Sequence, residues 1–242
     1  MKSGRRGWTI VEVVIVIVIV GLLVSLLVPG LHYGRSHALA SVTLANLRSH
    51  TQVFFVYAGD YQDSLPFLAV ASVEPTHHSA GGYSTEMLVF TQYASWPIAM
   101  AGEYYGGNVH SASFHPPGSN EVGPISEYWY SQSFVADPKF WMREYREYST
   151  TQLRAVMIHE VVFPSSKGLF IERDPALESW RTHHNAPGKL NFSLVDGAAK
   201  SSPASDLQRA YPGGCSGFLL GPIIGLPVLH TVDGVRGRDI SH

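Results

Sequence analysis

Residues 10–28 form a nineteen-residue stretch whose only polar side chains are Glu12 and Ser25. A helix rises about 1.5 Å per residue, so this stretch nearly spans the roughly 30 Å hydrocarbon core of a bilayer. Residues 13–20 are all Val or Ile, which favour strands in water. In lipid the backbone must satisfy its own hydrogen bonds, and a helix does this within one segment. The sequence therefore predicts a membrane helix.

The flanking charges predict the orientation of this helix. Lys2, Arg5 and Arg6 precede the apolar stretch, and the next basic residue is Arg35. Positive residues are retained on the cytoplasmic side of a membrane. We expect a single pass with a cytoplasmic N-terminus and an exported C-terminal part.

Glu12 is the unusual residue in this stretch, because a carboxylate embedded in lipid normally has a partner. Arg5 and Arg6 lie on its N-terminal side, and their long side chains can bend back towards it. No basic residue lies within two turns on its C-terminal side. A group from another molecule is the alternative partner.

Residues 7–12, Gly-Trp-Thr-Ile-Val-Glu, follow a short basic leader. This pattern resembles the cleavage and methylation signal of type IV prepilins and type II secretion pseudopilins, in which an aromatic residue follows a glycine and a glutamate lies four residues further on. Trp8 stands where that family usually has Phe. The resemblance implies that prepilin peptidase removes residues 1–7 by cutting between Gly7 and Trp8, and that the new amine of Trp8 is methylated.

The same resemblance implies how subunits assemble. In this family the glutamate is thought to pair with the N-terminal amine of a neighbouring subunit, and such an attraction is strong where the dielectric constant is low. The implied partners are other pilin or pseudopilin subunits, the inner-membrane assembly platform and membrane lipid. The protein would lie in the inner membrane first, and in a type IV pilus or type II secretion filament after assembly.

A second half of the helix is predicted after the membrane stretch. Pro29 and Gly30 predict a kink or a soft segment. Apolar residues then recur at helical spacing until Gly59 and Asp60, so residues 31–60 should form an amphipathic continuation. Its expected inward positions are Leu39, Leu44, Leu47, Thr51, Phe54, Phe55 and Ala58, and its expected polar positions are Asn46, Arg48, Ser49, His50 and Gln52.

Residues 61–242 are expected to form a β-rich periplasmic or extracellular domain, which gives an α+β, pilin-like fold with the helix packed on an antiparallel sheet. Residues 159–163 and 168–172 look like adjacent strands joined by a turn at 164–167. Alternation over residues 190–195, followed by Asp196 and Gly197, predicts a strand and a two-residue hairpin turn. Residues 198–201 would be the returning strand.

Three further segments resemble planctomycete- and verrucomicrobia-type prepilin-like proteins. Residues 45–66 are similar to their post-helix pattern, and residues 231–240 to their C-terminus. Residues 183–200 resemble an H-x9-DG signature, although eleven residues separate His184 from Asp196 and Gly197. A strand, a turn and a packed histidine are sufficient to explain this signature.

No cofactor and no metal site are predicted. His77, His78, His110 and His115 lack the spacing of a ligand set, and residues 77–82 look like an exposed loop. Asp60 and Asp63 suit calcium, but acidic loop residues more often form turns. Cys215 is the only cysteine, which excludes an internal disulfide.

The densest aromatic segment is interpreted as core rather than as a sugar-binding surface. Its members are Tyr128, Trp129, Tyr130, Phe134, Phe140, Trp141, Tyr145 and Tyr148.

Two Asp-Pro pairs, Asp137 with Pro138 and Asp174 with Pro175, predict helix starts. The broken apolar segment 218–229 is too interrupted for a second membrane span, and we expect it to be buried.

Three functional classes remain open. The chain is a filament subunit, or an exported binding module or enzyme cleaved at the A-x-A site of Ala38 and Ala40, or a permanently anchored sensor domain. No catalytic triad, phosphate loop or carboxylate pair indicates an enzyme. The net charge of −2 and the lack of a basic stripe argue against a nucleic-acid partner.

Overall fold

The computed structural model describes residues 9–72, 74–121, 123–147, 150–173, 189–208 and 226–240. The chain divides into two compact units, Met1–Ser41 and Val42–His242. The described elements include the helices α1 (Ile10–Asp60) and α2 (Gln92–Tyr104). The strands are β1 (Thr76–Ala80), β2 (Tyr83–Met87), β3 (Tyr128–Tyr130), β4 (Gly168–Glu172), β5 (Lys189–Leu194) and β6 (Ala199–Pro203). The predicted α+β class is confirmed.

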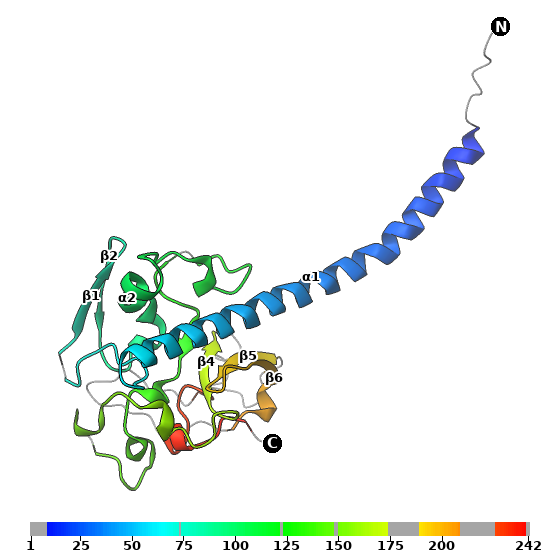
Figure 1. Ribbon diagram of the computed structural model, residues 1–242. Helices are drawn as coiled ribbons and strands as arrows, with labels where there is room; N and C mark the ends of the chain where they lie inside the picture. The colour runs from blue at the N-terminus through cyan, green and yellow to red at the C-terminus, as the bar shows by residue number, and fades with distance from the viewer. Residues whose placement is uncertain are drawn as a thin grey trace. The chain divides into compact units, whose positions relative to one another are not determined.

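The helix α1 ends at Asp60, as predicted, and it continues through Pro29. Figure 1 shows α1 as one continuous helical ribbon. The proline ring removes the hydrogen bond to the Ser25 carbonyl, yet the flanking turns remain helical. At Pro29 and Gly30, where a kink or a soft segment was predicted, the helix is therefore not interrupted.

Residues 42–60 of α1 belong to the second unit, and their amphipathic character is confirmed. Leu47, Thr51, Phe54 and Ala58 are buried at three- and four-residue spacing, whereas Arg48 is exposed. The side chains of this half contact the sheet. Thr51 Oγ1 donates to Ser193 Oγ on β5 at 2.7 Å, and the Phe54 ring packs edge-on against Phe170 of β4 at 4.6 Å between ring centroids.

His50 was expected on the polar face, and this prediction is wrong because its side chain is fully buried. Its two ring nitrogens are hydrogen-bonded to the Tyr105 hydroxyl at 2.8 Å and to the Ser113 carbonyl at 2.6 Å. Residues that follow α2 therefore cover a second side of α1. The sequence analysis assumed that α1 has one buried face, so it did not predict burial on this second side.

The larger sheet is an antiparallel meander in the order β3-β4-β5-β6. The strands predicted from 168–172, 190–195 and 198–201 are confirmed. The strand predicted at 159–163 is wrong, because Ile158–Glu160 is a 3-10 turn. The Glu160 carboxylate holds this turn by accepting from the Met157 amide at 3.0 Å and from Arg154 at 2.7 Å. The other neighbour of β4 is β3.

The β5–β6 connection contains the predicted Asp-Gly turn in a longer form. Gly197 has φ +87°, a conformation that favours glycine, whereas Asp196 does not have positive φ. The Asp196 carboxylate instead accepts from the Ala198 amide at 2.9 Å. The connection therefore spans residues 195–198, and a two-residue turn with two positive φ angles was the wrong prediction.

The exposed loop predicted at residues 77–82 is also wrong, because these residues belong to a hairpin. Strands β1 and β2 pair antiparallel from Thr76↔Met87 to Ala80↔Tyr83. Gly81 and Gly82 connect them with φ of +57° and +83°, as a two-residue turn of this hand requires. The hairpin lies beside α2 (Figure 1).

The aromatic segment supplies core, as predicted. Tyr128, Trp129, Tyr130, Phe134, Phe140 and Trp141 are buried, and Tyr145 is exposed. Their neighbours include Trp96 of α2, whose indole N–H donates to the Tyr128 carbonyl at 2.9 Å. The predicted helix start at Asp137 is confirmed as a short 3-10 helix, Pro138–Trp141, with the Asp137 side chain capping it. Leu226, Val228 and Leu229 are buried, as expected for segment 218–229.

Several predictions concern residues that the structure does not describe. The leader residues Lys2, Arg5, Arg6 and Gly7, together with Trp8, lie outside the described residues. The same holds for Tyr148, Asp174, Pro175, His184, Cys215 and residues 218–225.

Candidate functional site

The start of α1 is a capping box formed by Thr9 and Glu12. The Thr9 amide and hydroxyl donate to Glu12 Oε2 at 2.8 and 2.9 Å, and the Glu12 amide donates to Thr9 Oγ1 at 3.3 Å. A Thr-x-x-Glu sequence at a helix start satisfies amides that have no partner within the helix. The sequence contains this signal, because Thr9 and Glu12 have the spacing of a capping box.

The capping box uses one oxygen of the Glu12 carboxylate. Both bonds from Thr9 end on Oε2, and Oε1 accepts no hydrogen bond from the described residues. The residue is exposed. A carboxylate in the first turn is also favoured by the positive end of the helix dipole. The side chain is thus held in place within one chain while an oxygen stays available to another group.

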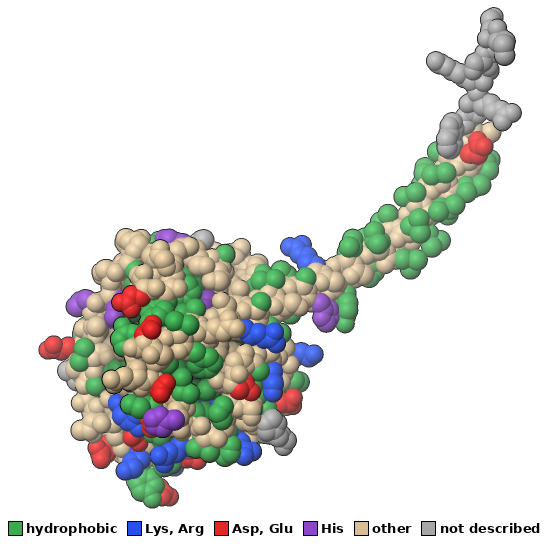
Figure 2. All heavy atoms as spheres, viewed as in Figure 1, with side chains coloured by type: hydrophobic (Ala, Val, Ile, Leu, Met, Phe, Trp, Pro, Cys, Tyr) green, Lys and Arg blue, Asp and Glu red, His purple; other side chains and the backbone are tan. Residues whose placement is uncertain are grey.

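The surface of α1 from Val13 to Val28 is apolar apart from Ser25. The large hydrophobic side chains of residues 10–28 are exposed by between 43% at Val13 and 84% at Ile10. Figure 2 shows hydrophobic side chains along the visible face of this helix. The helix is long and apolar enough to cross a membrane, and a signal sequence has the same properties.

Three serine hydroxyl groups of α1 donate to carbonyls of the preceding helical turn. Ser25 Oγ donates to the Leu22 carbonyl at 2.7 Å, Ser36 Oγ to the Tyr33 carbonyl at 2.9 Å, and Ser41 Oγ to the His37 carbonyl at 2.9 Å. Serines that bond back to the preceding turn expose little polar surface. Within the apolar residues 10–28, the Ser25 hydroxyl therefore has an acceptor inside the helix.

The C-terminal segment 231–240 meets the strand β4 in a buried polar network. Lys167 Nζ donates to Asp239 Oδ2 at 2.8 Å, to Ser133 Oγ at 3.2 Å and to Thr231 Oγ1. Asp239 Oδ2 also accepts from the Gly168 amide at 2.8 Å, and Oδ1 accepts from Thr231 Oγ1 at 2.5 Å. The side chains of Lys167 and Asp239 are 0% and 2% exposed.

This network is a structural clamp. Burial lowers the pKa of Lys167, while the neighbouring Asp239 opposes that shift. The ammonium group has three acceptors and the carboxylate has three donors, which is the condition under which a buried ion pair is tolerated. The sequence analysis predicted a turn at 164–167, and nothing in the sequence near Lys167 indicates its pairing with Asp239.

The turn that contains Asp196 and Gly197 lies against the same region. The Val195 amide donates to the Lys167 carbonyl at 2.9 Å and the Asp196 amide to the Pro164 carbonyl at 3.2 Å. The Asp-Gly part of the H-x-DG signature, Asp196 and Gly197, therefore has a structural role in the fold. Its histidine, His184, is outside the described residues.

Within the described residues there is no group of three or more His, Cys, Asp or Glu side chains arranged to hold a metal ion. His78 Nε2 donates to the Leu68 carbonyl at 2.6 Å, and His115 is bonded to Glu127 at 3.1 Å. Asp60 accepts from the Tyr104 hydroxyl at 3.0 Å, and Asp63 has φ +63°. The 60–63 segment thus has the turn chemistry that the sequence favoured over a calcium loop.

No protein-family model matches this chain, and neither a curated protein nor a solved structure matches it. What the chain does is therefore inferred from its own residues.

Proposed function

We propose that the chain is a pilin-like or pseudopilin-like structural subunit. Prepilin peptidase processes it, and it assembles through α1 into a type IV pilus or a type II secretion filament. The observation that carries this proposal is the start of α1, where a carboxylate held by Thr9 precedes the exposed apolar residues 13–28. The Gly7–Trp8 pair and the basic leader lie immediately before it.

Assembly suits the physical properties of this helix. Exposed apolar surface of this extent normally has a partner, and α1 offers the same surface to lipid and to the helices of other copies. Cleavage after Gly7 would remove Lys2, Arg5 and Arg6 and create a positive amine on Trp8. The free oxygen of Glu12 is a suitable acceptor for the amine of a neighbouring copy, because attraction between opposite charges is strong in an apolar bundle.

The alternative is an exported or single-pass anchored binding or sensor domain that does not polymerise. One observation favours it. The second compact unit begins at Val42, and cleavage after Ala40 of the A-x-A site would release it with one extra residue. Against this, the apolar stretch ends at Val28 and is longer than the 7 to 15 residues of ordinary signal sequences.

The mature N-terminus separates these functions. We expect native protein to begin at Trp8 and to carry a methyl group on its amine, as measured by mass spectrometry of N-terminal peptides. A start at Ser41 would identify a conventional export signal. An intact Met1 in every molecule would identify a permanent anchor and contradict the filament proposal.

The charge of Glu12 is tested by Glu12→Gln. Glutamine also fits a capping box, so the helix start is preserved while the charge is lost. We expect normal membrane insertion and at least about tenfold less cross-linked oligomer, a loss typical of one charge pair.

Thr9→Ala is the matched control for this variant. It removes the capping hydroxyl and keeps both the carboxylate and the Thr9 backbone amide that donates to it. This variant should assemble. If Glu12→Gln forms oligomers as well as the unchanged protein does, charge pairing is not the assembly mechanism.

A further inference from the structure

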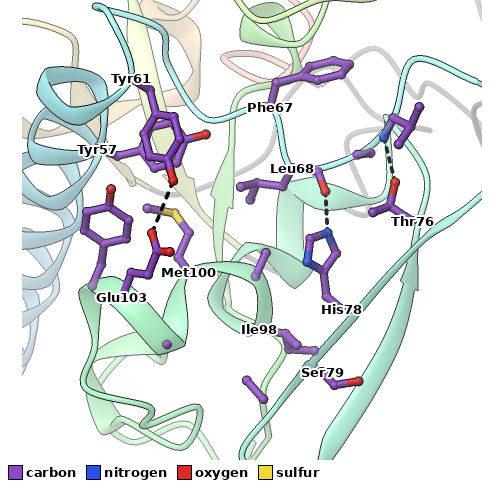
Figure 3. A pocket seen from close by; sticks show the side chains of 16 residues that line it. Tyr57, Tyr61, Phe67, Leu68, Thr76, His78, Ser79, Ile98, Met100 and Glu103 are labelled. Atoms are coloured by element: carbon purple, nitrogen blue, oxygen red, sulfur yellow. Dashed lines mark hydrogen bonds between the residues drawn. The ribbon is translucent and has the colours of Figure 1, made fainter.

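A cavity of about 480 Å³ lies within the second unit, between the end of α1, the helix α2, the strand β1 and residues 67–70. Figure 3 shows Tyr57, Tyr61, Met100 and Glu103 on one side of it and His78 on the other. Its volume is within the range of about 300 to 1,000 Å³ that is usual for small-ligand sites. This cavity has no role in the proposed filament assembly, and it is not part of the packed core of the domain.

Tyrosine rings form one wall of the cavity. The rings of Tyr57 and Tyr61 are stacked, with 4.3 Å between centroids and 17° between planes. The Tyr104 ring lies 5.7 Å from that of Tyr57. Tyr61 is 44% exposed, so this wall is open to an incoming molecule. Aromatic faces carry partial negative charge and attract cations.

The same wall carries the carboxylate of Glu103, and Asp60, which does not line the cavity, is bonded to one of its tyrosines. Glu103 Oε2 accepts from the Tyr61 hydroxyl at 3.4 Å, and Asp60 Oδ2 accepts from the Tyr104 hydroxyl at 3.0 Å. The negative charge of Glu103 raises the pKa of Tyr61. Burial is the main cause of the raised pKa of Tyr104, and Asp60 adds to it. The local field therefore favours positive charge.

The described residues that line the cavity bring no lysine or arginine to this wall. The lining histidine, His78, donates its Nε2 hydrogen to the Leu68 carbonyl. The thioether of Met100 is also among the lining groups, and it is polarisable and packs well against alkyl groups. The cavity thus combines aromatic faces, an exposed carboxylate and an apolar floor.

We propose that this cavity binds an alkylammonium group. The charge would lie against Glu103 and the tyrosine rings, and the alkyl part would contact Met100 and the apolar lining. An anion would be repelled, and a neutral ligand of the same shape would lack the main attraction. The group has two possible sources, a small quaternary amine or a lysine side chain of a peptide. This site does not depend on filament assembly.

Binding is tested by calorimetry on the full chain in a maltoside detergent, which carries no ammonium headgroup. Choline, Nα-acetyl-lysine amide and the neutral choline isostere 3,3-dimethylbutan-1-ol are the probes. We expect one of the two cations to bind at least about tenfold more tightly than the neutral isostere. Tighter binding of choline identifies a small quaternary amine as the ligand class, and tighter binding of the lysine probe identifies a peptide side chain.

Two substitutions locate the binding. Tyr61→Ala and Glu103→Gln should each weaken the binding of the preferred cation by about tenfold. Tyr61→Phe keeps the ring and should retain affinity within about threefold. Glu121→Gln, at an exposed acid outside the cavity, is the matched control and should change nothing.

Three results would overturn the proposal. The first is an affinity for the neutral isostere equal to that for both cations. The second is no binding of either cation at about 10 mM, beyond the weakest affinities of specific sites. The third is cation binding that neither Tyr61→Ala nor Glu103→Gln alters. None of these results bears on the start of the mature chain, so the site and the filament proposal fail independently.

Discussion

Asp239→Asn is expected to lower the free energy of unfolding by about 3 to 5 kcal/mol, the usual cost of breaking a buried ion pair by removing one partner. The ammonium of Lys167 is completely buried, and Asp239, 2.8 Å away, is its charged partner within the described residues. Ser133 and Thr231 supply only neutral oxygens to it. The unfolding midpoint in urea, followed by tryptophan fluorescence of the full chain in detergent, measures the loss.

Lys167→Met combined with Asp239→Asn separates charge from packing. The double variant has no buried charge, and its amide oxygen can still accept from the Gly168 amide. We expect the double variant to be more stable than the sum of the two single losses predicts, by about 1 to 3 kcal/mol. Glu86→Gln is the control, because Glu86 forms a pair with His77 in which both side chains are 68% exposed, and such pairs contribute little.

A small effect of Asp239→Asn would contradict this account. If that variant unfolds within about 1 kcal/mol of the unchanged protein, Lys167 is neutral in the folded state and the pair is not ionic. The segment 226–240 would then be held by its buried apolar side chains, Val228 and Leu229 among them.

The sequence predicts those parts of the fold that depend on local patterns. Alternation of Leu190 and Phe192 with polar neighbours, followed by Asp196 and Gly197, defined the β5–β6 hairpin. The apolar stretch and the spacing of Leu47 and Phe54 defined α1. In each case the signal lies within one continuous segment, where the pattern of apolar residues indicates the type of element.

Contacts between segments that are distant in the sequence cannot be predicted from local patterns. Lys167 and Asp239 are 72 residues apart, and nothing near either residue indicates its partner. His50 is similar, because its polar side chain suggests an exposed position. Only the later residues Tyr105 and Ser113 provide the bonds that allow it to be buried. Polar residues within a core are specified by their partners rather than by a pattern.

The candidate site also has a part that the sequence predicts and a part that it does not. The capping box of Thr9 and Glu12 spans four residues, so the sequence contains it completely. The proposed amine partner belongs to another copy of the chain, and no single chain contains that contact. The aromatic and acidic cavity needs three elements, α1, α2 and β1, to come together, and its tyrosines look like ordinary core residues in the sequence.

His50 is expected to make the folded domain sensitive to mild acid. Its ring lies among Trp96, Phe114, Tyr128 and Phe170. Burial lowers the pKa of His50 to about 4, although the Ser113 carbonyl opposes that shift. The carbonyl can only accept, so Nε2 carries the hydrogen and Nδ1 accepts from the Tyr105 hydroxyl. A second proton would have to displace that bond inside an apolar cluster.

The direction of the pH effect follows from these values. The unfolded chain has an ordinary histidine pKa of about 6.5, which is above the folded value. Between about pH 6.5 and pH 4 the unfolded state binds the additional proton, so stability decreases as the pH falls through this window. The contribution of His50 is complete above about pH 6.5. Its loss approaches about 3 kcal/mol near pH 4, because each pH interval of one corresponds to about 1.4 kcal/mol.

His50→Gln isolates this contribution from those of the carboxylates, which also titrate in acid. Glutamine does not ionise, and its amide can donate to the Ser113 carbonyl. The variant should be less stable at pH 7, because it leaves part of the aromatic cluster unfilled. The difference between the two proteins in urea midpoint should shrink as the pH falls from 6.5 to 4. Parallel midpoints across this window, or an NMR titration of the His50 ring near pH 6.5, would show that burial does not suppress its protonation.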